Sequence, residues 1–223
     1  MTVTLNPDPQ VAVRPLTKTE KVMSRAMLAA WSAPQFNIVV DIDMQHALGQ
    51  RRPGVTVTDI ILSACAKALI QFPAMNAHFR DDAVHEYAVA NVGLAVASPR
   101  GLTVPVIHGA DGLSLDGIAE RRKALVEKVR TGSISVSEVV GGTFTVSNLG
   151  MFDVRQFTAI LNPPQVGILA VGSTRTIQVW NDGAPEWRPI SAFSLTCDHR
   201  AVDGALAARF LGVVKDILEG CTT

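Results

Sequence analysis

One histidine stands where it could act as a base. His199 lies in the segment 197–204 (CDHRAVDG), which follows an apolar strand pattern and precedes an apolar helix pattern. A side chain at a strand end is held by the sheet and can still reach a cleft. Histidine is also the side chain most easily used as a base near neutral pH. The position indicates either a catalytic base or a structural, hydrogen-bonded histidine.

A serine at the end of a second strand pattern could stabilise negative charge. The segment 141–150 (GGTFTVSNLG) alternates like a strand and then ends in Ser147, Asn148 and a glycine. One interpretation is a strand and a turn, with Thr143 and Thr145 exposed. The other is that the serine hydroxyl donates a hydrogen bond to a developing oxyanion. The segment does not match a phosphate-binding loop, because it has no Lys-Ser/Thr partner and no dinucleotide fingerprint.

Other reactive side chains have simpler interpretations. Cys197 is two residues from His199, so both would point to one face of a strand, and a cysteine nucleophile has to be considered. The cysteine continues an apolar run, Phe193–Thr196, and we favour a packing role for it. The remaining histidines are expected on the surface or at caps, and no cluster has metal-ligand spacing, so no metal is predicted. They are His46, His78, His85 and His108.

The elements that position these residues are a mixture of helices and strands. Thr17 and Glu20 have capping-box spacing at the start of the first helix, and Thr58 is the expected cap of the second. Residues 1–12 are predicted to be a flexible arm, and residues 13–223 a single α/β domain. Helices are predicted at Lys18–Ala30, Thr58–Phe72, Ser114–Arg130 and Asp203–Leu218. Strands are predicted at Phe36–Met44, Val89–Ala97 (buried on both faces), Leu102–Ile107, Gly141–Val146, Val166–Ser173 and Ile190–Thr196.

The composition excludes several classes of protein. Of 223 residues, 48% are hydrophobic and 18% are charged, which excludes a disordered chain. Lys+Arg and Asp+Glu are both 20, and zero net charge gives no support for nucleic acid or an anionic membrane as partner. No apolar stretch approaches the roughly 20 residues of a transmembrane helix. Three cysteines without paired spacing, and no signal-peptide pattern, predict free thiols and a cytoplasmic location.

Four segments together resemble a known family. The segments NVGLAVASPRGLTVPVI, GGTFTVSNLGMF, ILNPPQVGILAVG and DHRAVDGALAARFL are similar to the catalytic domain of dihydrolipoamide acyltransferases. These are the E2 components of 2-oxoacid dehydrogenase complexes and are related to chloramphenicol acetyltransferase. The similarity runs from about Val13 to Leu218, in the family's order and spacing.

The resemblance implies a fold, an assembly and a set of residue roles. The fold would be a chloramphenicol-acetyltransferase-like two-layer sandwich with a mixed β-sheet, assembled as a homotrimer with active sites at subunit interfaces. His199 would be the general base, and Asp203 would keep the site in its geometry. Ser147 would come from the neighbouring subunit and bind the oxyanion. Acyl-CoA, with acetyl-CoA favoured, would be a co-substrate, and no cofactor would be tightly bound.

Three departures from the family pattern point to a stand-alone enzyme. The chain has only a dozen residues before the catalytic domain, and it ends soon after Leu218 without the family's further apolar segment. Ala26 and Gln35 stand where the family usually has an arginine and a histidine, and whether Arg25 replaces that arginine is open. The sequence therefore favours transfer of an acetyl group from acetyl-CoA to a hydroxyl of a small biosynthetic intermediate, such as a tetronate, by a discrete trimer.

Two alternatives stay open at this point. One is an E2 core domain that acts on dihydrolipoamide, and the other is a catalytically silent scaffold of the same fold. The sequence does not identify the acceptor, the acyl group or the coenzyme-binding residues, nor does it separate a complete chain from part of a multidomain one.

Overall fold

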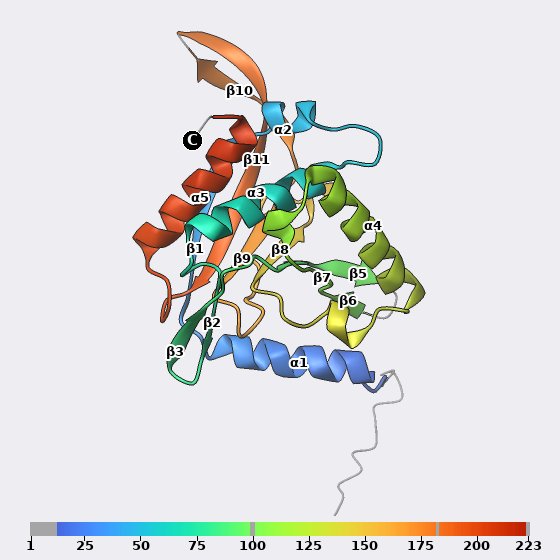
Figure 1. Cartoon of the computed structure of the whole chain (residues 1–223). Helices are drawn as coiled ribbons and strands as arrows, with labels where there is room; N and C mark the ends of the chain where they lie inside the picture. Colours follow the sequence, from blue (N-terminus) through green and yellow to red (C-terminus); the bar gives the residue numbers. More distant parts are fainter. Residues whose placement is uncertain (1–12, 99–100, 182, 222–223) are drawn as a thin grey trace, which may run out of the picture.

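A mixed β-sheet of seven strands is the framework of the computed structural model, which describes residues 13–98, 101–181 and 183–221 (Figure 1). The strand order is β1-β11-β9-β8-β4-β7. β10 pairs with the first part of β11, before the part that pairs with β1 and β9. β8 runs parallel to β9 and β4, whereas the other neighbours are antiparallel. The strands are β1 (Gln35–Asp43), β4 (Val92–Leu94), β7 (Val106–Ile107), β8 (Phe144–Asn148), β9 (Gly167–Val171), β10 (Arg175–Asn181) and β11 (Ala184–Asp198).

Three helices form a second layer on one face of this sheet (Figure 1). They are α3 (Val57–Gln71), α4 (Leu115–Thr131) and α5 (Gly204–Glu219). A single buried hydrophobic cluster joins them to the sheet, and Phe144, Phe193 and Phe210 are among its fully buried side chains. This arrangement confirms the predicted two-layer α/β fold with a mixed sheet.

Smaller elements surround these two layers. α1 (Lys18–Trp31) runs along one end of the sheet, and α2 (Gln45–Gly49) follows β1 (Figure 1). Two hairpins lie outside the main sheet: β2 (Ala77–Arg80) with β3 (Ala83–Glu86), and β5 (Val96–Ser98) with β6 (Gly101–Thr103). Short 3₁₀ turns cover Ala110–Gly112, Val136–Glu138 and Gly150–Phe152. The predicted arm over residues 1–12 lies outside the described residues.

Side-chain caps fix where the helices begin. Thr17 and Glu20 form the predicted capping box at α1. The expected cap of α3 is wrong by two residues: Thr56, not Thr58, forms a capping box with Asp59. Asp59, three positions after Thr56, accepts a hydrogen bond from the backbone N–H of Thr56. The residue three positions after Thr58 is Ile61, which has no side-chain acceptor.

Two predicted strands are divided in the structure. The segment Val89–Ala97 gives β4 in the main sheet and β5 in a separate hairpin, and only β4 is buried throughout. The segment Leu102–Ile107 gives β6 and β7. Pro105 separates them because proline has no N–H to donate to a strand ladder. β10 was not predicted, and β11 starts six residues before its predicted first residue. Both segments are mostly exposed there, and β10 has only a short apolar alternation, at Ile177 and Val179.

Candidate active site

His199 lies directly after β11 and is exposed to solvent. Its backbone N–H donates a hydrogen bond of 2.9 Å to the carbonyl oxygen of Pro34, which precedes β1. Its imidazole ring packs on the Phe36 ring, with 4.8 Å between the ring centroids. The backbone position is therefore fixed by the residue before the neighbouring strand, and the side chain stays exposed to solvent.

The residues on either side of His199 are locked to each other. Asp198 is 3% exposed and accepts hydrogen bonds from Arg200 through the backbone N (3.0 Å), Nε (2.9 Å) and Nη2 (2.6 Å). The Arg200 guanidinium also lies over the Phe79 ring of the β2–β3 hairpin, 4.1 Å from its centroid. The hydrogen bond to Asp198 is the main cause of the raised pKa of Arg200. This two-point contact of the Arg200 guanidinium with the Asp198 carboxylate, the Asp198–Arg200 fork, has a specific geometry and holds the turn that carries His199.

Asp203 caps the helix that follows. Its carboxylate accepts a hydrogen bond of 2.7 Å from the backbone N–H of Leu206 at the start of α5. In this way it fixes the point where the His199 turn enters the helix. Arg25 lies exposed on α1 and makes no hydrogen bond or ion pair with another described residue, and whether it replaces the arginine expected at Ala26 stays open.

Ser147 lies near the end of β8, beside a separate cavity of about 330 Å³. Apolar side chains of residues 94–97, Met151 and Phe152 form much of its wall, and Thr58, Arg122 and Asn148 add polar groups. The amide of Asn148 donates to the Thr58 hydroxyl at 3.2 Å. The hydroxyl of Ser147 has no hydrogen-bond partner among the described residues, so it is available to a ligand.

His199 and Ser147 are far apart within one chain. The register places Ser147 opposite Ala170 of β9, and Ala170 opposite Ser194 of β11. Two strand spacings and five residues along β11 therefore separate Ser147 from His199, on the order of 19 Å. A base and an oxyanion donor that serve one reaction centre must each lie within hydrogen-bond reach, about 3 Å, of the atoms bonded to its carbonyl carbon. A single copy therefore cannot bring these side chains to one reaction centre.

Several other sequence predictions can now be decided. Cys197 is fully buried, and burial raises the pKa of its thiol to about 12, which supports a packing role. Thr143 and Thr145 are buried, not exposed, and each hydroxyl has an acceptor: the Asn91 carbonyl oxygen for Thr143 and the Gln165 side-chain oxygen for Thr145. His78 is also buried, contrary to prediction, and burial lowers its pKa. Its ring nitrogens are 2.8 Å from the Gly142 oxygen and 2.9 Å from the Tyr87 hydroxyl.

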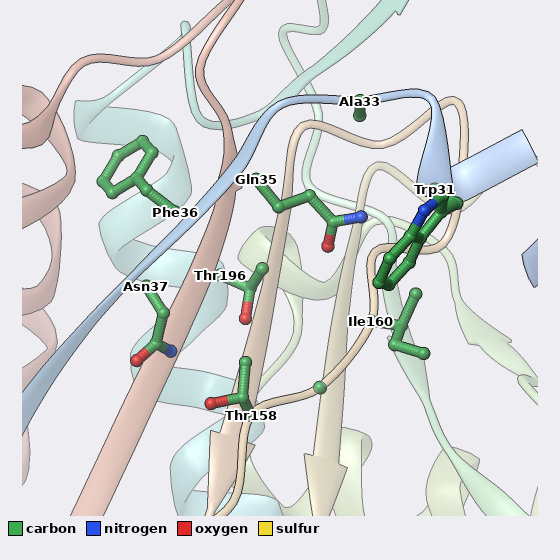
Figure 2. Close-up of a pocket in the computed structure, with 9 residues that line it drawn as sticks. Trp31, Ala33, Gln35, Phe36, Asn37, Thr158, Ile160 and Thr196 are labelled. Carbon is green, nitrogen blue, oxygen red and sulfur yellow. The ribbon is translucent and has the colours of Figure 1, made fainter.

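A second cavity of about 330 Å³ lies between the end of α1, β1 and residues 158–160 (Figure 2). Trp31, Gln35 and Ile160 border it, and the buried Thr196 hydroxyl beside it has no partner among the described residues. Figure 2 shows the Phe36 ring on the other side of β1 from these side chains. Phe36 is also one of the residues that line this cavity, and its ring is the one on which His199 packs.

Sequence reasoning missed the ion pair beside the Ser147 cavity. The Nε atom of Arg122 lies 2.5 Å from Oδ1 of Asp59, which is fully buried. The two residues are 63 positions apart, so no local spacing could have joined them.

Within the described ranges, no group of three or more potential metal ligands occurs. No helix among these residues has the length and apolar character needed to cross a membrane.

Comparison with known proteins matches nearly the whole chain to one family. The model of the 2-oxoacid dehydrogenases acyltransferase (catalytic domain) family matches residues 8–223. A mitochondrial dihydrolipoyllysine-residue acetyltransferase component of the pyruvate dehydrogenase complex, from Schizosaccharomyces pombe, is 37% identical over 218 residues. That match covers 92% of this chain and 45% of the relative, so the chain spans about half the relative's length.

Solved structures agree with this similarity. The probable dihydrolipoamide acetyltransferase of Listeria monocytogenes superimposes with a TM-score of 0.91 and 30% identity, covering 96% of this chain and 97% of that one. The cubic core of a pyruvate dehydrogenase multienzyme complex gives 0.90 and 30%, covering 94% and 92%. A chloramphenicol acetyltransferase, at 0.58 and 13% identity over 87% and 94%, shares the fold.

One further structure bears on the candidate residues. The Azotobacter vinelandii dihydrolipoamide acetyltransferase has a TM-score of 0.90 and 31% identity, with 94% of this chain and 92% of that one covered. It was studied for the role of a serine, a histidine and an asparagine in its catalytic mechanism. The histidine follows the serine by 52 residues and precedes the asparagine by four. Ser147, His199 and Asp203 have the same spacing in this chain.

Proposed function

Because the chain belongs to the 2-oxoacid dehydrogenases acyltransferase family, we propose that it transfers an acyl group between coenzyme A and a dihydrolipoyl group. The observation that carries this proposal is that two reactive side chains, the exposed ring of His199 and the hydroxyl of Ser147, have no hydrogen-bond partner among the described residues. Their spacing matches that of the serine and histidine studied in the Azotobacter enzyme. Asp203 stands in place of the asparagine, and either residue can cap a helix.

This proposal reverses the preference drawn from the sequence. The comparisons favour the dihydrolipoyl alternative, because the relatives found are named as dihydrolipoyl acetyltransferases. None of these names supports a hydroxyl acceptor such as a tetronate. The cytoplasmic location stays a prediction, since the Schizosaccharomyces relative is mitochondrial.

The proposed chemistry uses both side chains in one step. The imidazole of His199 accepts the proton of the attacking thiol, and the thiolate attacks the carbonyl carbon of the thioester. Ser147 donates a hydrogen bond to the oxyanion of the tetrahedral intermediate. When the intermediate collapses, the other thiolate leaves and takes the proton from His199. No acyl-enzyme is required, because both substrates are bound next to each other.

We further propose that the site is shared between copies of the chain. The separation of His199 from Ser147 within one chain requires that a second copy supply the missing partner. A heterologous contact that closes into a ring satisfies this, and a trimer is the assembly that the family resemblance implies. The related cubic core shows that a 30% identical protein takes part in a larger assembly.

The experiment that tests the function offers two classes of acceptor to the enzyme. Purified protein is incubated with acetyl-CoA and either dihydrolipoamide or a panel of small alcohols, and products are identified by mass spectrometry. We expect S-acetyldihydrolipoamide and free coenzyme A. Acetylation of an alcohol without any acetylation of the dithiol would contradict the proposal.

A further inference from the structure

Arg122 is a cation that borders the Ser147 cavity. It lies on α4, its side chain is 17% exposed, and it shares the cavity wall with Thr58, Asn148 and Ser147. Its Nε–H group donates to Oδ1 of Asp59 at 2.5 Å. A charged side chain placed beside an otherwise largely apolar cavity needs an explanation, because burial of a charge is costly unless it is paired and hydrogen-bonded.

The partner carboxylate is already fully satisfied. Asp59 is 0% exposed, and its second oxygen, Oδ2, accepts hydrogen bonds of 2.7 Å from both the backbone N and the hydroxyl of Thr56. It therefore balances the charge of Arg122 but uses only the Nε–H of the guanidinium. A guanidinium has five N–H donors. The Nη groups of Arg122 have no acceptor among the described residues.

The charge balance selects the kind of acceptor that would complete this arrangement. Donors left without an acceptor beside an apolar wall are unfavourable, so a ligand oxygen in the cavity would be favoured there. Among the described residues, no other charged side chain lines this cavity. Because Asp59 already neutralises Arg122, an uncharged carbonyl oxygen suits the site better than a carboxylate or a phosphate.

We propose that the Nη groups of Arg122 bind an amide carbonyl oxygen of the thiol-bearing arm whose thioester reaches Ser147. This inference rests on the proposed function for the placement of the thioester, and it adds a residue that selects the substrate. Both candidate arms carry amides: the pantetheine arm of coenzyme A and the carboxamide end of dihydrolipoamide. The shared chemistry is the amide carbonyl, and the experiment separates the two sources.

The test compares substrates that have or lack the amide. The variant is the double substitution Asp59→Asn with Arg122→Leu, which leaves no buried charge unpaired. Acetyl donors are acetyl-CoA, S-acetyl-N-acetylcysteamine and the amide-free S-ethyl thioacetate. Acceptors are dihydrolipoamide and the amide-free 1,3-propanedithiol. We expect kcat/KM to fall about tenfold to hundredfold for the amide-bearing members of one arm only, and to change less than twofold for its amide-free member.

Two controls keep structural effects apart from binding. Arg121→Leu changes the adjacent, exposed arginine of α4 and is expected to leave every kcat/KM value within twofold. Thermal unfolding of the double variant, followed by circular dichroism, shows whether the fold survives. If the double variant does not fold, Arg122→Lys is used, which keeps the charge but loses the planar fork and is expected to give the same amide-dependent pattern.

Direct titration separates this inference from the proposed function. Coenzyme A and dihydrolipoamide are each titrated calorimetrically into the wild type and the variant, with no chemistry required. A wild type that transfers no acyl group to dihydrolipoamide overturns the proposed function. Weaker binding of one amide-bearing ligand to the variant still supports the role of Arg122. Equal losses for amide-bearing and amide-free substrates, or no loss on either arm, overturn that role.

Discussion

The turn that carries His199 and the cavity that contains Ser147 differ in how far their own chain completes them. The turn is held on three sides, by the Asp198–Arg200 fork, by the Pro34 carbonyl and by the Phe36 ring. The hydroxyl of Ser147 has no partner among the described residues, and exposed apolar side chains of residues 151–152 border its cavity. The proposed base, His199, is therefore held in place within one chain, whereas the proposed oxyanion donor, Ser147, would acquire its partner from substrate.

The largest expected effect is the loss of the base. Substitution of His199→Ala should lower kcat by roughly 10²–10⁴, because general-base catalysis contributes about that factor. Steady-state assays with acetyl-CoA and dihydrolipoamide measure it, and the exposed position of the ring should leave folding unchanged. Turnover near the wild-type level would contradict the assigned role.

Ser147→Ala should lower kcat by roughly 10²–10³ with little change in KM, since its hydrogen bond strengthens as charge develops on the oxygen. A variant that lost only affinity would move this residue from catalysis to binding.

Mixing the two inactive variants sharpens the comparison. If each site takes its histidine from one copy and its serine from the next, co-refolded His199→Ala and Ser147→Ala chains restore both groups in about a quarter of sites. Recovered activity supports a shared site, and none would place both groups within one chain.

The Asp198–Arg200 fork should matter less than the base it positions. Arg200→Lys keeps the charge but loses the planar, two-point contact with Asp198. We expect kcat to fall roughly tenfold to hundredfold with KM unchanged, because a small displacement of a catalytic group is costly. A double-mutant cycle with Asp198→Asn should be non-additive. A fall in thermal stability alone, without the kcat effect, would reduce the fork to a structural role.

Asp203 permits a test of capping against chemistry. Asp203→Ala should destabilise the protein by about 1 kcal/mol, because α5 loses its N-cap, whereas Asp203→Asn should retain stability and most activity. Chemical denaturation and initial rates give the two measurements. If Asn abolished turnover while the fold persisted, the carboxylate charge itself would be required.

The smallest effect is expected from the buried thiols. Burial raises the pKa of both Cys65 and Cys197 to about 12, so both stay protonated and unreactive below that pH. Native iodoacetamide treatment should label only the exposed Cys221, as peptide mass spectrometry can show. Cys197→Ser should retain most activity. Inactivation by alkylation at Cys197, prevented by acyl-CoA, would instead indicate a thiol role.

Local patterns predicted the elements that are strongly periodic or capped. The α1 capping box, the α4 and α5 helices and the apolar face of β1 all followed from sequence spacing of a few residues. Pro105 divided a predicted strand, and the apolar alternation of the mostly exposed β10, at Ile177 and Val179, was too short to reveal it. Thr143 and Thr145 were misjudged because their partners, Asn91 and Gln165, are 52 and 20 residues away.

The sequence by itself determined the family, the fold class and the three candidate residues, because each lies in a short segment whose residue types and order are specific. Only the tertiary structure decided how these residues are held and how they are separated. The strand register places Ser147 and His199 apart, and the packing of α3 against α4 brings Asp59 to Arg122. Such pairings join residues dozens of positions apart, and the spacing within a local segment contains no information about which distant segments will pack together.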